Sequence, residues 1–354
     1  MLLVLNTGSS SIKLALFRPD LEQVLEGQVA GIGGQARLTL GDAEKHLTAA
    51  SHAEGIAAIL DALEEHGIAA ADITAAAHRV VHGGTALTAP TRLDEAAIAA
   101  IEANVPLAPL HNPPALAGIR AVTEALPHLP QYASFDTAFH AVQPELATTY
   151  AIPESWRAKG LRRYGFHGLS YAGMVTQFGD ALPRRLLALH LGAGVSLCAI
   201  RDGRSVATSM GYSPLSGPTM ATRSGDIDGM AVLRMAEDIG IEATGRVLNK
   251  ESGLIALGGT SDMRRLLAAD SDAARFAVDH FIWSVTHQAG ALIADMGGVD
   301  AVAFTGGIGE NSEDIRQRIM DRLAWLGPLP VHVIPAEEER QIARDAVALI
   351  GKEG

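Results

Sequence analysis

Three segments of the chain place glycine, hydroxyl and amide groups directly after an apolar run. Residues 6–13 read NTGSSSIK, residues 190–194 read HLGAG and residues 306–312 read GGIGENS. Turns of this composition direct backbone N–H groups and hydroxyls toward an anion, most often phosphate, and Lys13 adds an ammonium group. For the first segment alone, an ordinary serine-rich hairpin is an equal alternative. The recurrence of the pattern favours a nucleotide, whose phosphates these segments would bind.

Two arginines stand where a charged side chain needs a partner. Arg79 lies in the apolar run of residues 73–81, and Arg223 lies in the segment TMATRSGD, residues 219–226. One interpretation of each is a buried ion pair with a carboxylate, because arginine is rarely buried without a partner. The functional interpretation is a clamp on carboxylate or phosphoryl oxygens, which the planar guanidinium fits.

His167 and His111 are the histidine candidates. His167 lies between glycines in the segment YGFHG. The glycines would let a ligand approach closely, but a core histidine bonded to the backbone is the alternative. His111 precedes an Asn-Pro pair and could equally be a residue at a helix entry. A zinc site is disfavoured, because the histidines lack the tight spacing of metal ligands and Cys198 is the single cysteine.

Asp136 and the run of residues 337–339 are the acidic candidates. For the three glutamates, a solvated first turn of a helix is the main alternative. Mg²⁺ needs few protein ligands, since it keeps water molecules and phosphate oxygens in its coordination shell. One carboxylate and the amide of Asn6 could therefore suffice.

The elements that would position these residues form a mixed α/β pattern. The apolar residues 2–5 and the alternating residues 12–16 predict two strands joined by a tight turn. Asp136 would then follow a buried strand, at the edge where α/β proteins place their sites. Further predicted strands are residues 23–30, 36–40, 45–49, 73–81 and 131–135, and the predicted helices are residues 53–66, 94–104 and 113–126, the last with Asn112 as its N-cap.

Residues 186–200 repeat the layout of residues 2–17, in which a glycine-containing turn joins two apolar strands. We therefore predict an internal repeat, with two similarly built domains, a boundary near residues 140–150 and the nucleotide phosphates between the domains. Later predicted elements are helices at residues 226–239, 242–250, from 262 and 272–296, a strand at 299–305, a glycine turn at 306–312 with a helix to 326, and a final helix at 336–350.

Length and charge narrow the class of protein. A chain of 354 residues, 48% hydrophobic and 19% charged, suits two α/β domains. The net charge of −12 argues against nucleic acid, which needs a basic surface. The N-terminal segment lacks the features of a signal peptide, and no run reaches the roughly 20 apolar residues of a membrane span. We therefore expect a cytoplasmic protein without a membrane partner. The motifs of P-loop NTPases and of dinucleotide-binding βαβ units are absent.

Over nearly its whole length, the chain resembles the acetate kinase family, which includes acetate, propionate and butyrate kinases and belongs to the actin–Hsp70–sugar kinase superfamily. The motifs that carry the resemblance are LNTGSSSIK, HRVVHGG, PLHNPPAL, FDTAFH, RRYGFHGLSY, LHLGAGVS, ATRSGDIDG, LNKESG, SDMR, FTGGIGENS and IPAEEERQIARD. The resemblance implies an α/β fold of the duplicated actin/Hsp70-like, ribonuclease H-like type, with mixed sheets and a cleft between two domains. Residues 1–142 with 338–354 would bind the carboxylate and metal, and residues 143–337 would bind the nucleotide and form a homodimer.

The activity that the resemblance implies is reversible transfer of the γ-phosphoryl group of ATP to acetate, with Mg²⁺ as cofactor and Mn²⁺ as an alternative. Asn6 and Glu338 would hold the metal ion. Asp136 is the family's acid or base position, although a carboxylate substrate hardly needs a base. The residues that would contact the nucleotide and its phosphates are Ser9, Ser11, Lys13, His190, Leu191, Gly192, Ala193, Gly194, Asp262, Met263, Arg264, Gly307, Ile308, Gly309, Glu310 and Asn311.

The resemblance assigns the remaining charged positions to the carboxylate and the transferring group. Arg79 would bind the substrate carboxylate. Arg223 and His167, with His111 in support, would stabilise the transferring phosphoryl group. The residues that would form the pocket for the acyl methyl group are Val81, Leu110, Phe166 and Pro214. These types favour acetate, with propionate or butyrate as the alternative substrate, since one methylene changes discrimination by only about 1–3 kcal/mol.

Four features depart from the family pattern. The chain is shorter than usual members, chiefly between residues 327 and 331. Ala193 replaces an asparagine, Tyr171 replaces a second histidine and Arg340 replaces a leucine. Ala193 bears on nucleotide preference, whereas the other two bear on packing. The more distant alternatives are an actin- or Hsp70-like ATPase and a non-catalytic nucleotide sensor; the retained charged positions disfavour both.

Overall fold

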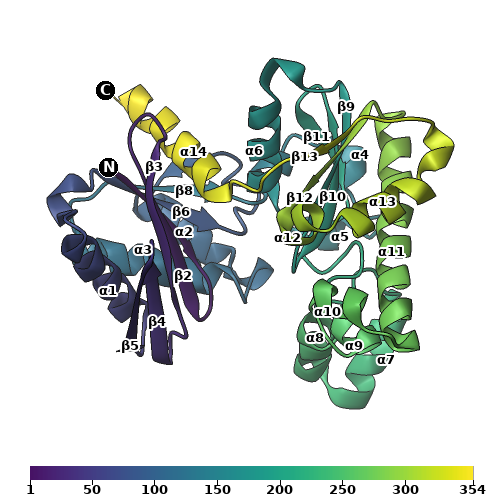
Figure 1. Ribbon diagram of the computed structural model, residues 1–354, viewed down its shortest axis with the longest axis horizontal. Helices are drawn as coiled ribbons and strands as arrows, with labels where there is room; N and C mark the ends of the chain where they lie inside the picture. Colours follow the sequence, from purple (N-terminus) through teal and green to yellow (C-terminus); the bar gives the residue numbers. More distant parts are fainter. Residues whose placement is uncertain (354) are drawn as a thin grey trace. The chain divides into compact units, whose positions relative to one another are not determined.

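The computed structural model describes residues 1–353, which group into two units (Figure 1). Unit 1 comprises Met1–Ala141 and Glu337–Gly354, and unit 2 comprises Val142–Ala336. Each unit is built around one mixed sheet with helices on its faces. No helix among residues 1–353 has the length and apolar character needed to cross a membrane.

The sheet of unit 1 has the strand order β5-β4-β3-β2-β1-β6-β8-β7. The strands from β5 to β1 pair antiparallel, β6 runs parallel to β1, and β8 runs parallel to β6. The chain thus builds the first part of the sheet with hairpins and extends it through helical crossovers, as the sequence predicted. The strands are β1 (Leu2–Thr7), β2 (Ser11–Phe17), β3 (Gln23–Ala30), β4 (Gly34–Leu40), β5 (Ala43–Ala49), β6 (Ala75–Val80), β7 (Thr91–Arg92) and β8 (Gln131–Phe135).

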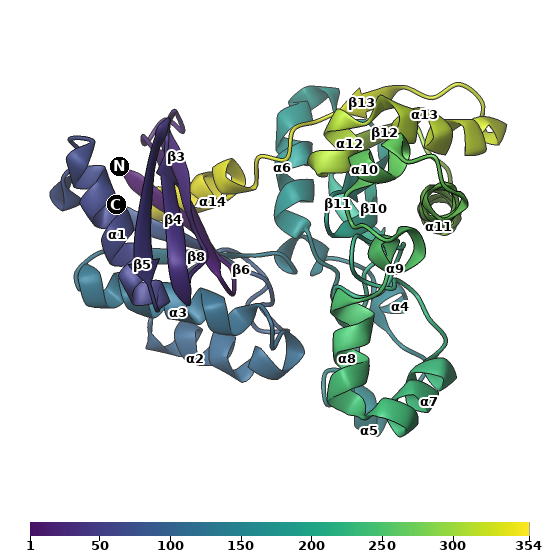
Figure 2. The same cartoon turned by 60° about the horizontal axis from the view of Figure 1, so that its bottom comes forward.

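Helices cover both faces of this sheet (Figure 2). On one face, α1 (His52–Glu65) and α3 (Asn112–Ala125) pack over a core that includes Leu3, Leu5 and Ile59. The C-terminal helix α14 (Glu338–Glu353) contacts β1, β2, β6 and β8, and Ser134 Oγ on β8 donates a 2.8 Å hydrogen bond to Asp345 on this helix. Because side chains alternate along a strand, the residues of β6 that face α14 are those that do not face α3.

Helix α2 (Glu95–Ala103) lies beside α3, and its N-cap Asp94 accepts a hydrogen bond from Ala97 N, as an acidic cap should. The prediction that Asn112 caps α3 was wrong. Asn112 is the first residue of α3, and its amide instead exchanges hydrogen bonds of 3.1 and 3.0 Å with the backbone of His82. The backbone of His82, thirty residues away in the sequence, therefore binds the Asn112 side chain that would otherwise cap the helix.

The sheet of unit 2 has the order β11-β10-β9-β12-β13. Its pairings are antiparallel between β11, β10 and β9 and parallel between β9, β12 and β13. The segment β3-β2-β1-β6-β8 of unit 1 has the same order and directions, which confirms the predicted duplication. The strands are β9 (Arg185–Leu191), β10 (Val195–Arg201), β11 (Arg204–Thr208), β12 (Ala301–Thr305) and β13 (Val331–Val333).

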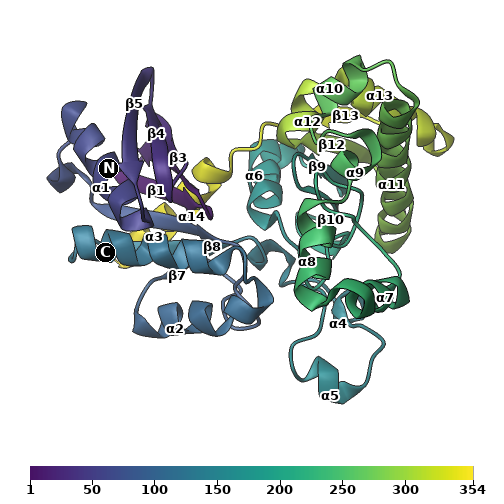
Figure 3. The same ribbon diagram turned by 90° about the horizontal axis from the view of Figure 1, so that it is seen from below.

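The helices of unit 2 include the long α11 (Asp272–Met296), which contacts β9, β10 and β11, and α6 (Gly168–Phe178), which lies on the other side of the sheet. Helices α7 (Gly229–Ile239) and α8 (Ile241–Lys250) lie next to each other (Figure 3). The shorter helices are α4 (Glu145–Thr148), α5 (Glu154–Arg157), α9 (Leu254–Gly258), α10 (Met263–Ala268), α12 (Gly306–Asn311) and α13 (Glu313–Arg322).

The glycine-rich segment after β12 differs from the prediction. Residues 306–312 were expected to form a turn before one helix to residue 326, but Gly306–Asn311 is itself the helix α12, and α13 ends at Arg322. The carboxylate of Glu310 accepts a 2.9 Å hydrogen bond from Gly306 N. A side chain from the helix thus caps its own N-terminus, which makes a helix of this composition possible.

Candidate functional site

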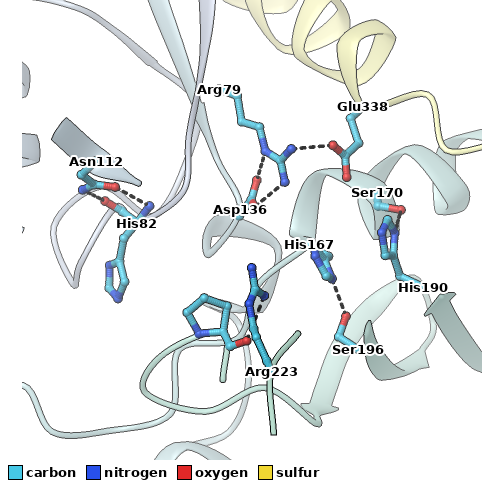
Figure 4. A network of polar contacts seen from close by, with 11 residues as sticks. Arg79, His82, Asn112, Asp136, His167, Ser170, His190, Ser196, Arg223 and Glu338 are labelled. Carbon is cyan, nitrogen blue, oxygen red and sulfur yellow. Dashed lines mark hydrogen bonds and ion pairs between the residues drawn. The ribbon is translucent and has the colours of Figure 1, made fainter. Parts of the chain in front are cut away.

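Arg79, Asp136 and Glu338 form one ion-pair network in unit 1 (Figure 4). Arg79 lies on β6, Asp136 directly follows β8, and Glu338 begins α14. The Nε and Nη2 groups of Arg79 donate to Asp136 Oδ1 and Oδ2 at 2.9 and 2.7 Å, and Nη1 lies 2.8 Å from Glu338 Oε2. The parallel pairing of β6 and β8 puts Arg79 opposite Ser134, two residues before Asp136, so the pair is fixed by register.

The charges in this network do not cancel, since two carboxylates face one guanidinium. Burial disfavours the charged form of Arg79, but Asp136 and Glu338 outweigh it and raise the pKa of Arg79. Burial also raises the pKa of Glu338, and Asp136 and Glu339 act in the same direction, whereas Arg79 and Lys13 oppose it. An excess of buried negative charge is the environment that a hard cation would relieve.

An oxygen ligand for such a cation lies on the neighbouring strand β1, in the side-chain amide of Asn6. Asn6 pairs with Lys13 across the β1–β2 hairpin, and Lys13 is close enough to Glu338 to affect the pKa of its carboxyl group. Within residues 1–353, no group of three or more histidine, cysteine, aspartate or glutamate side chains could by itself hold a metal. The two residues that the resemblance assigns to the metal, Asn6 and Glu338, both belong to unit 1.

The other candidate site residues of unit 1 differ in how far their side chains are exposed. Ser9 is exposed, whereas Ser11, Val81 and His111 are half-buried and Leu110 is 51% exposed. His111 immediately precedes α3 but makes no side-chain cap bond to it. Phe166 and Pro214 belong to unit 2, so the acyl pocket assigned to Val81, Leu110, Phe166 and Pro214 stays a prediction.

His167 in unit 2 is held in an unusual conformation. Its φ of 57° and ψ of 23° lie in the left-handed region, which costs a residue with a side chain about 1–2 kcal/mol. Its ring stacks on His190 with centroids 4.1 Å apart, and its Nδ1 lies 2.9 Å from Ser196 Oγ (Figure 4). His190 Nδ1 in turn lies 2.9 Å from Ser170 Oγ on α6. These contacts fix the ring and compensate for the backbone strain.

Arg223 is a largely buried cation without a carboxylate partner among residues 1–353. Its Nη1 donates to Pro214 O at 3.1 Å and lies 3.8 Å from the sulfur of Met220. Burial lowers the pKa of Arg223, whereas the buried Arg79 has its pKa raised by its carboxylates. A buried guanidinium that lacks a counter-ion is expected to bind an anion from outside the chain.

Arg223 and His167 converge at Gly194, in the turn between β9 and β10. A Cβ atom on Gly194 would lie 3.0 Å from His167 Nε2 and 3.5 Å from Arg223 Nη1. The glycine thus leaves room beside a donor nitrogen and a guanidinium, which together form a site for an oxyanion.

A cavity of about 920 Å³ lies within unit 2, in the size range of small-molecule sites. It contains eight of the residues assigned to nucleotide contacts, from the β9–β10 turn and from α10 and α12. Its apolar part, which includes Met263, Leu267 and Ile308, suits the face of a planar ring. The lining residues are Gly192, Ala193, Ala221, Ser261, Asp262, Met263, Arg264, Leu267, Ala268, Gly307, Ile308, Asn311 and Ser312.

Some assigned nucleotide contacts do not line this cavity. Leu191 is fully buried, Gly309 is buried, and Glu310 accepts hydrogen bonds from Gly306 N and Ala336 N at 2.9 and 3.0 Å. Sequence reasoning also missed Ser196, Ser170 and Ala221. The two serines are single hydroxyls in ordinary apolar contexts, and only the folded positions of the histidines reveal their importance.

The adjacent glycines Gly306 and Gly307 should differ in how much a substitution destabilises the fold. Gly306 has a φ of +79°, and a Cβ atom there would lie 2.9 Å from Leu191 O, whereas one on Gly307 would meet nothing within 4 Å. We expect Gly306→Ala to lower the free energy of unfolding by about 2 kcal/mol and Gly307→Ala to change it by less than about 0.5 kcal/mol. Thermal unfolding of both variants measures this difference, and equal midpoints would contradict it.

Comparisons with known proteins agree over the whole chain. Residues 1–346 match the profile of the Acetokinase family. A protein named acetate kinase from Methylocella silvestris is 39% identical, over 98% of this chain and 97% of its own length. The crystal structure of a propionate kinase from Francisella tularensis superposes with a TM-score of 0.92 at 33% identity, covering 97% of this chain and 98% of that one. That of Porphyromonas gingivalis acetate kinase superposes with a TM-score of 0.91 at 32% identity, covering 99% of each chain.

Proposed function

The chain belongs to the acetokinase family, and on this basis we propose that it transfers the γ-phosphoryl group of ATP reversibly to acetate, giving acetyl phosphate and ADP. The resemblance drawn from the sequence motifs is thereby confirmed. The observation that carries the proposal is Arg223, a largely buried cation beside His167 Nε2 that has no counter-ion within the described residues 1–353. It lies in the unit that also contains a cavity large enough for a nucleotide.

The proposed mechanism is direct in-line transfer through a loose transition state. Because negative charge spreads over the equatorial oxygens of the transferring group, catalysis depends on positioning and on positive charge. We assign Arg223 and His167 to these oxygens. The glycine backbone at Gly192 and Gly307 would allow the nucleotide phosphates to approach closely, and the apolar residues of the cavity would bind the base.

The carboxylate and the metal are assigned to unit 1. Three contacts to Asp136 and Glu338 leave N–H groups of Arg79 for one more carboxylate. The excess negative charge of this network and the amide of Asn6 fit Mg²⁺, with Mn²⁺ as the alternative, held by Asn6 and Glu338. When bound, the ion would supply positive charge to the phosphate oxygens.

Asp136 is better suited to orient Arg79 than to act as a base. Both of its carboxylate oxygens accept hydrogen bonds from Arg79, and its side chain is only 3% exposed. Acetate is already ionised at neutral pH, so the attacking oxygen needs no proton removed. We therefore assign Asp136 to preorganisation of the carboxylate site.

The direct test is an assay with hydroxylamine, which traps an acyl phosphate as a hydroxamate. With Mg-ATP and acetate, the purified protein is expected to form acetyl hydroxamate, and no hydroxamate with any acid of two to four carbons would disprove a kinase of this class. Values of kcat/KM for acetate, propionate and butyrate in one assay decide the preferred acid. We expect acetate first and propionate second, with a discrimination of about 10- to 200-fold per methylene.

We also propose a cytoplasmic homodimer, since ATP is an intracellular metabolite and the family resemblance implies an interface through the second domain. Helix α7 has no buried residue, and it exposes Met230 and Leu233 by 70% and 56%. Ile241, at the start of α8, is 83% exposed. Apolar side chains grouped in this way usually mark an interaction surface.

A further inference from the structure

Three hydrogen-bonding groups form a chain from the interior of unit 2 to His167. The hydroxyl of Tyr171 lies 2.6 Å from Ser196 Oγ, and Ser196 Oγ lies 2.9 Å from His167 Nδ1. Tyr171 on α6 and Ser196 on β10 are both fully buried. The other ring nitrogen, Nε2, faces Gly194 and Arg223. One nitrogen of His167 is thus held by the protein, while the other faces the oxyanion site.

The chemistry of the three groups gives the chain a direction. Burial raises the pKa of Tyr171 well above its usual range, so the phenol keeps its proton. A phenol is a stronger hydrogen-bond donor than an alcohol, and an alcohol that accepts one hydrogen bond donates the next more strongly. Tyr171 would therefore donate to Ser196, and Ser196 would donate to His167 Nδ1.

We propose that Tyr171 and Ser196 are positioning residues that hold the neutral ring of His167 in the tautomer with its proton on Nε2. In this tautomer His167 presents an N–H donor to the anionic transferring group, whereas the other tautomer would present a lone pair and repel it. The ring is already fixed by its stack on His190 and by its left-handed backbone. The hydroxyl chain therefore acts on the proton and not on the position of the ring. This inference rests on the proposed function of His167.

Kinetics of four variants test the inference. Tyr171→Phe and Ser196→Ala are each expected to lower kcat by about 10- to 100-fold, as the loss of a supporting hydrogen bond to an active histidine does, with KM for ATP and acetate within about twofold of wild type. Because the groups act in series, the double variant should be no slower than Ser196→Ala. Ser196→Thr keeps the hydroxyl and should restore most of kcat.

A matched control removes a buried hydroxyl that is not part of the hydrogen-bond chain from Tyr171 to His167. Tyr164 is also buried, and its hydroxyl donates to Gly160 O at 3.0 Å. Tyr164→Phe is expected to leave kcat within about twofold of wild type. Multiplicative losses in the double variant, or a loss in Tyr164→Phe equal to that in Tyr171→Phe, would overturn the inference, since either result indicates a general packing effect.

The tautomer itself is measured by NMR of the protein labelled with ¹⁵N-histidine, with the His167 signals assigned from a His167→Gln spectrum. We expect the Nε2–H tautomer in wild type and a mixture of tautomers in Ser196→Ala. An unchanged tautomer in Ser196→Ala would overturn the inference. Because this measurement needs no turnover, it separates the two claims: a wild-type protein that forms no acetyl phosphate but shows the tautomer shift would refute the proposed function and support the hydroxyl chain.

Discussion

Replacing Arg223 with alanine is expected to lower kcat by about 10³-fold while KM for ATP changes less than about threefold. An arginine that stabilises the transferring phosphoryl group contributes 10³-fold or more, because its charge acts mainly in the transition state. Arg223 is not among the residues that line the cavity of unit 2, so nucleotide affinity should depend on it weakly. Steady-state kinetics with saturating acetate measure the effect.

Thermal stability distinguishes a catalytic Arg223 from an arginine that stabilises the fold. Without an anion bound, this largely buried guanidinium is poorly compensated, because its side-chain contacts among residues 1–353 are Pro214 O and the Met220 sulfur. We therefore expect Arg223→Met to keep or raise the thermal midpoint of the ligand-free protein, although its kcat falls as in Arg223→Ala. If Arg223 instead stabilised the fold, Arg223→Met would lower the thermal midpoint.

Two further variants complete this test. Arg223→Lys keeps the charge but loses the planar fork, so its kcat should lie between those of wild type and Arg223→Ala. Arg246→Ala, which removes an exposed arginine paired with Glu251 in the same unit, should leave kcat unchanged. A kcat within threefold of wild type in Arg223→Ala would remove Arg223 from the transfer step.

The sequence predicted the duplication because strand pairing has a local signature. Short turns join the paired strand ends in both units: four residues separate Thr7 from Ile12 in unit 1, and three separate Leu191 from Val195 in unit 2. A strand–turn–strand pattern of this kind specifies the hairpin, and the same topology then follows in both sheets. The β10–β11 hairpin was overlooked although Asp202-Gly203 is a strong local signal, with φ values of 52° and 76° that fit a tight hairpin turn.

The partners of the charged residues could not be predicted in the same way. Arg79 allowed either a carboxylate pair or a substrate clamp, and the structure places it in a pair with Asp136 and Glu338, which are remote in sequence. Both interpretations of Arg79 thus remain compatible, because the pair leaves N–H groups for a substrate. For Arg223 the sequence motif looked equally ambiguous, and only its position among Pro214, Met220 and Gly194 separates it from a structural arginine.

Replacing Arg79 with alanine is expected to lower both stability and activity. The substitution leaves the carboxylates of Asp136 and Glu338 buried without their shared cation, and breaking a buried ion pair in this way costs about 3–5 kcal/mol. It also removes the group assigned to the acetate carboxylate, so kcat/KM for acetate should fall by about 10³-fold. Thermal unfolding in the presence of a chelator and steady-state kinetics measure the two effects.

The loss of stability should depend on pH in a defined direction. Burial already raises the pKa of Glu338 above 4.5, and removing Arg79 takes away a charge that opposes this rise. A carboxyl group whose pKa is higher in the folded state than in the unfolded state destabilises the fold as pH rises through the folded pKa, because the unfolded chain releases its proton first. The loss of unfolding free energy in Arg79→Ala, relative to wild type, should therefore be larger at pH 8 than at pH 5.

A second substitution distinguishes this electrostatic effect from lost packing. Adding Glu338→Gln to Arg79→Ala removes one of the two unpaired charges, so the double variant should regain part of the lost stability at pH 8 and none of the activity. Glu337→Gln, on a neighbouring glutamate that pairs with Arg340, is the matched control and should not rescue Arg79→Ala. If the double variant is as unstable as the single one at pH 8, the cost of Arg79→Ala lies in packing, and the negative charge that favours a cation at this site is smaller than the geometry indicates.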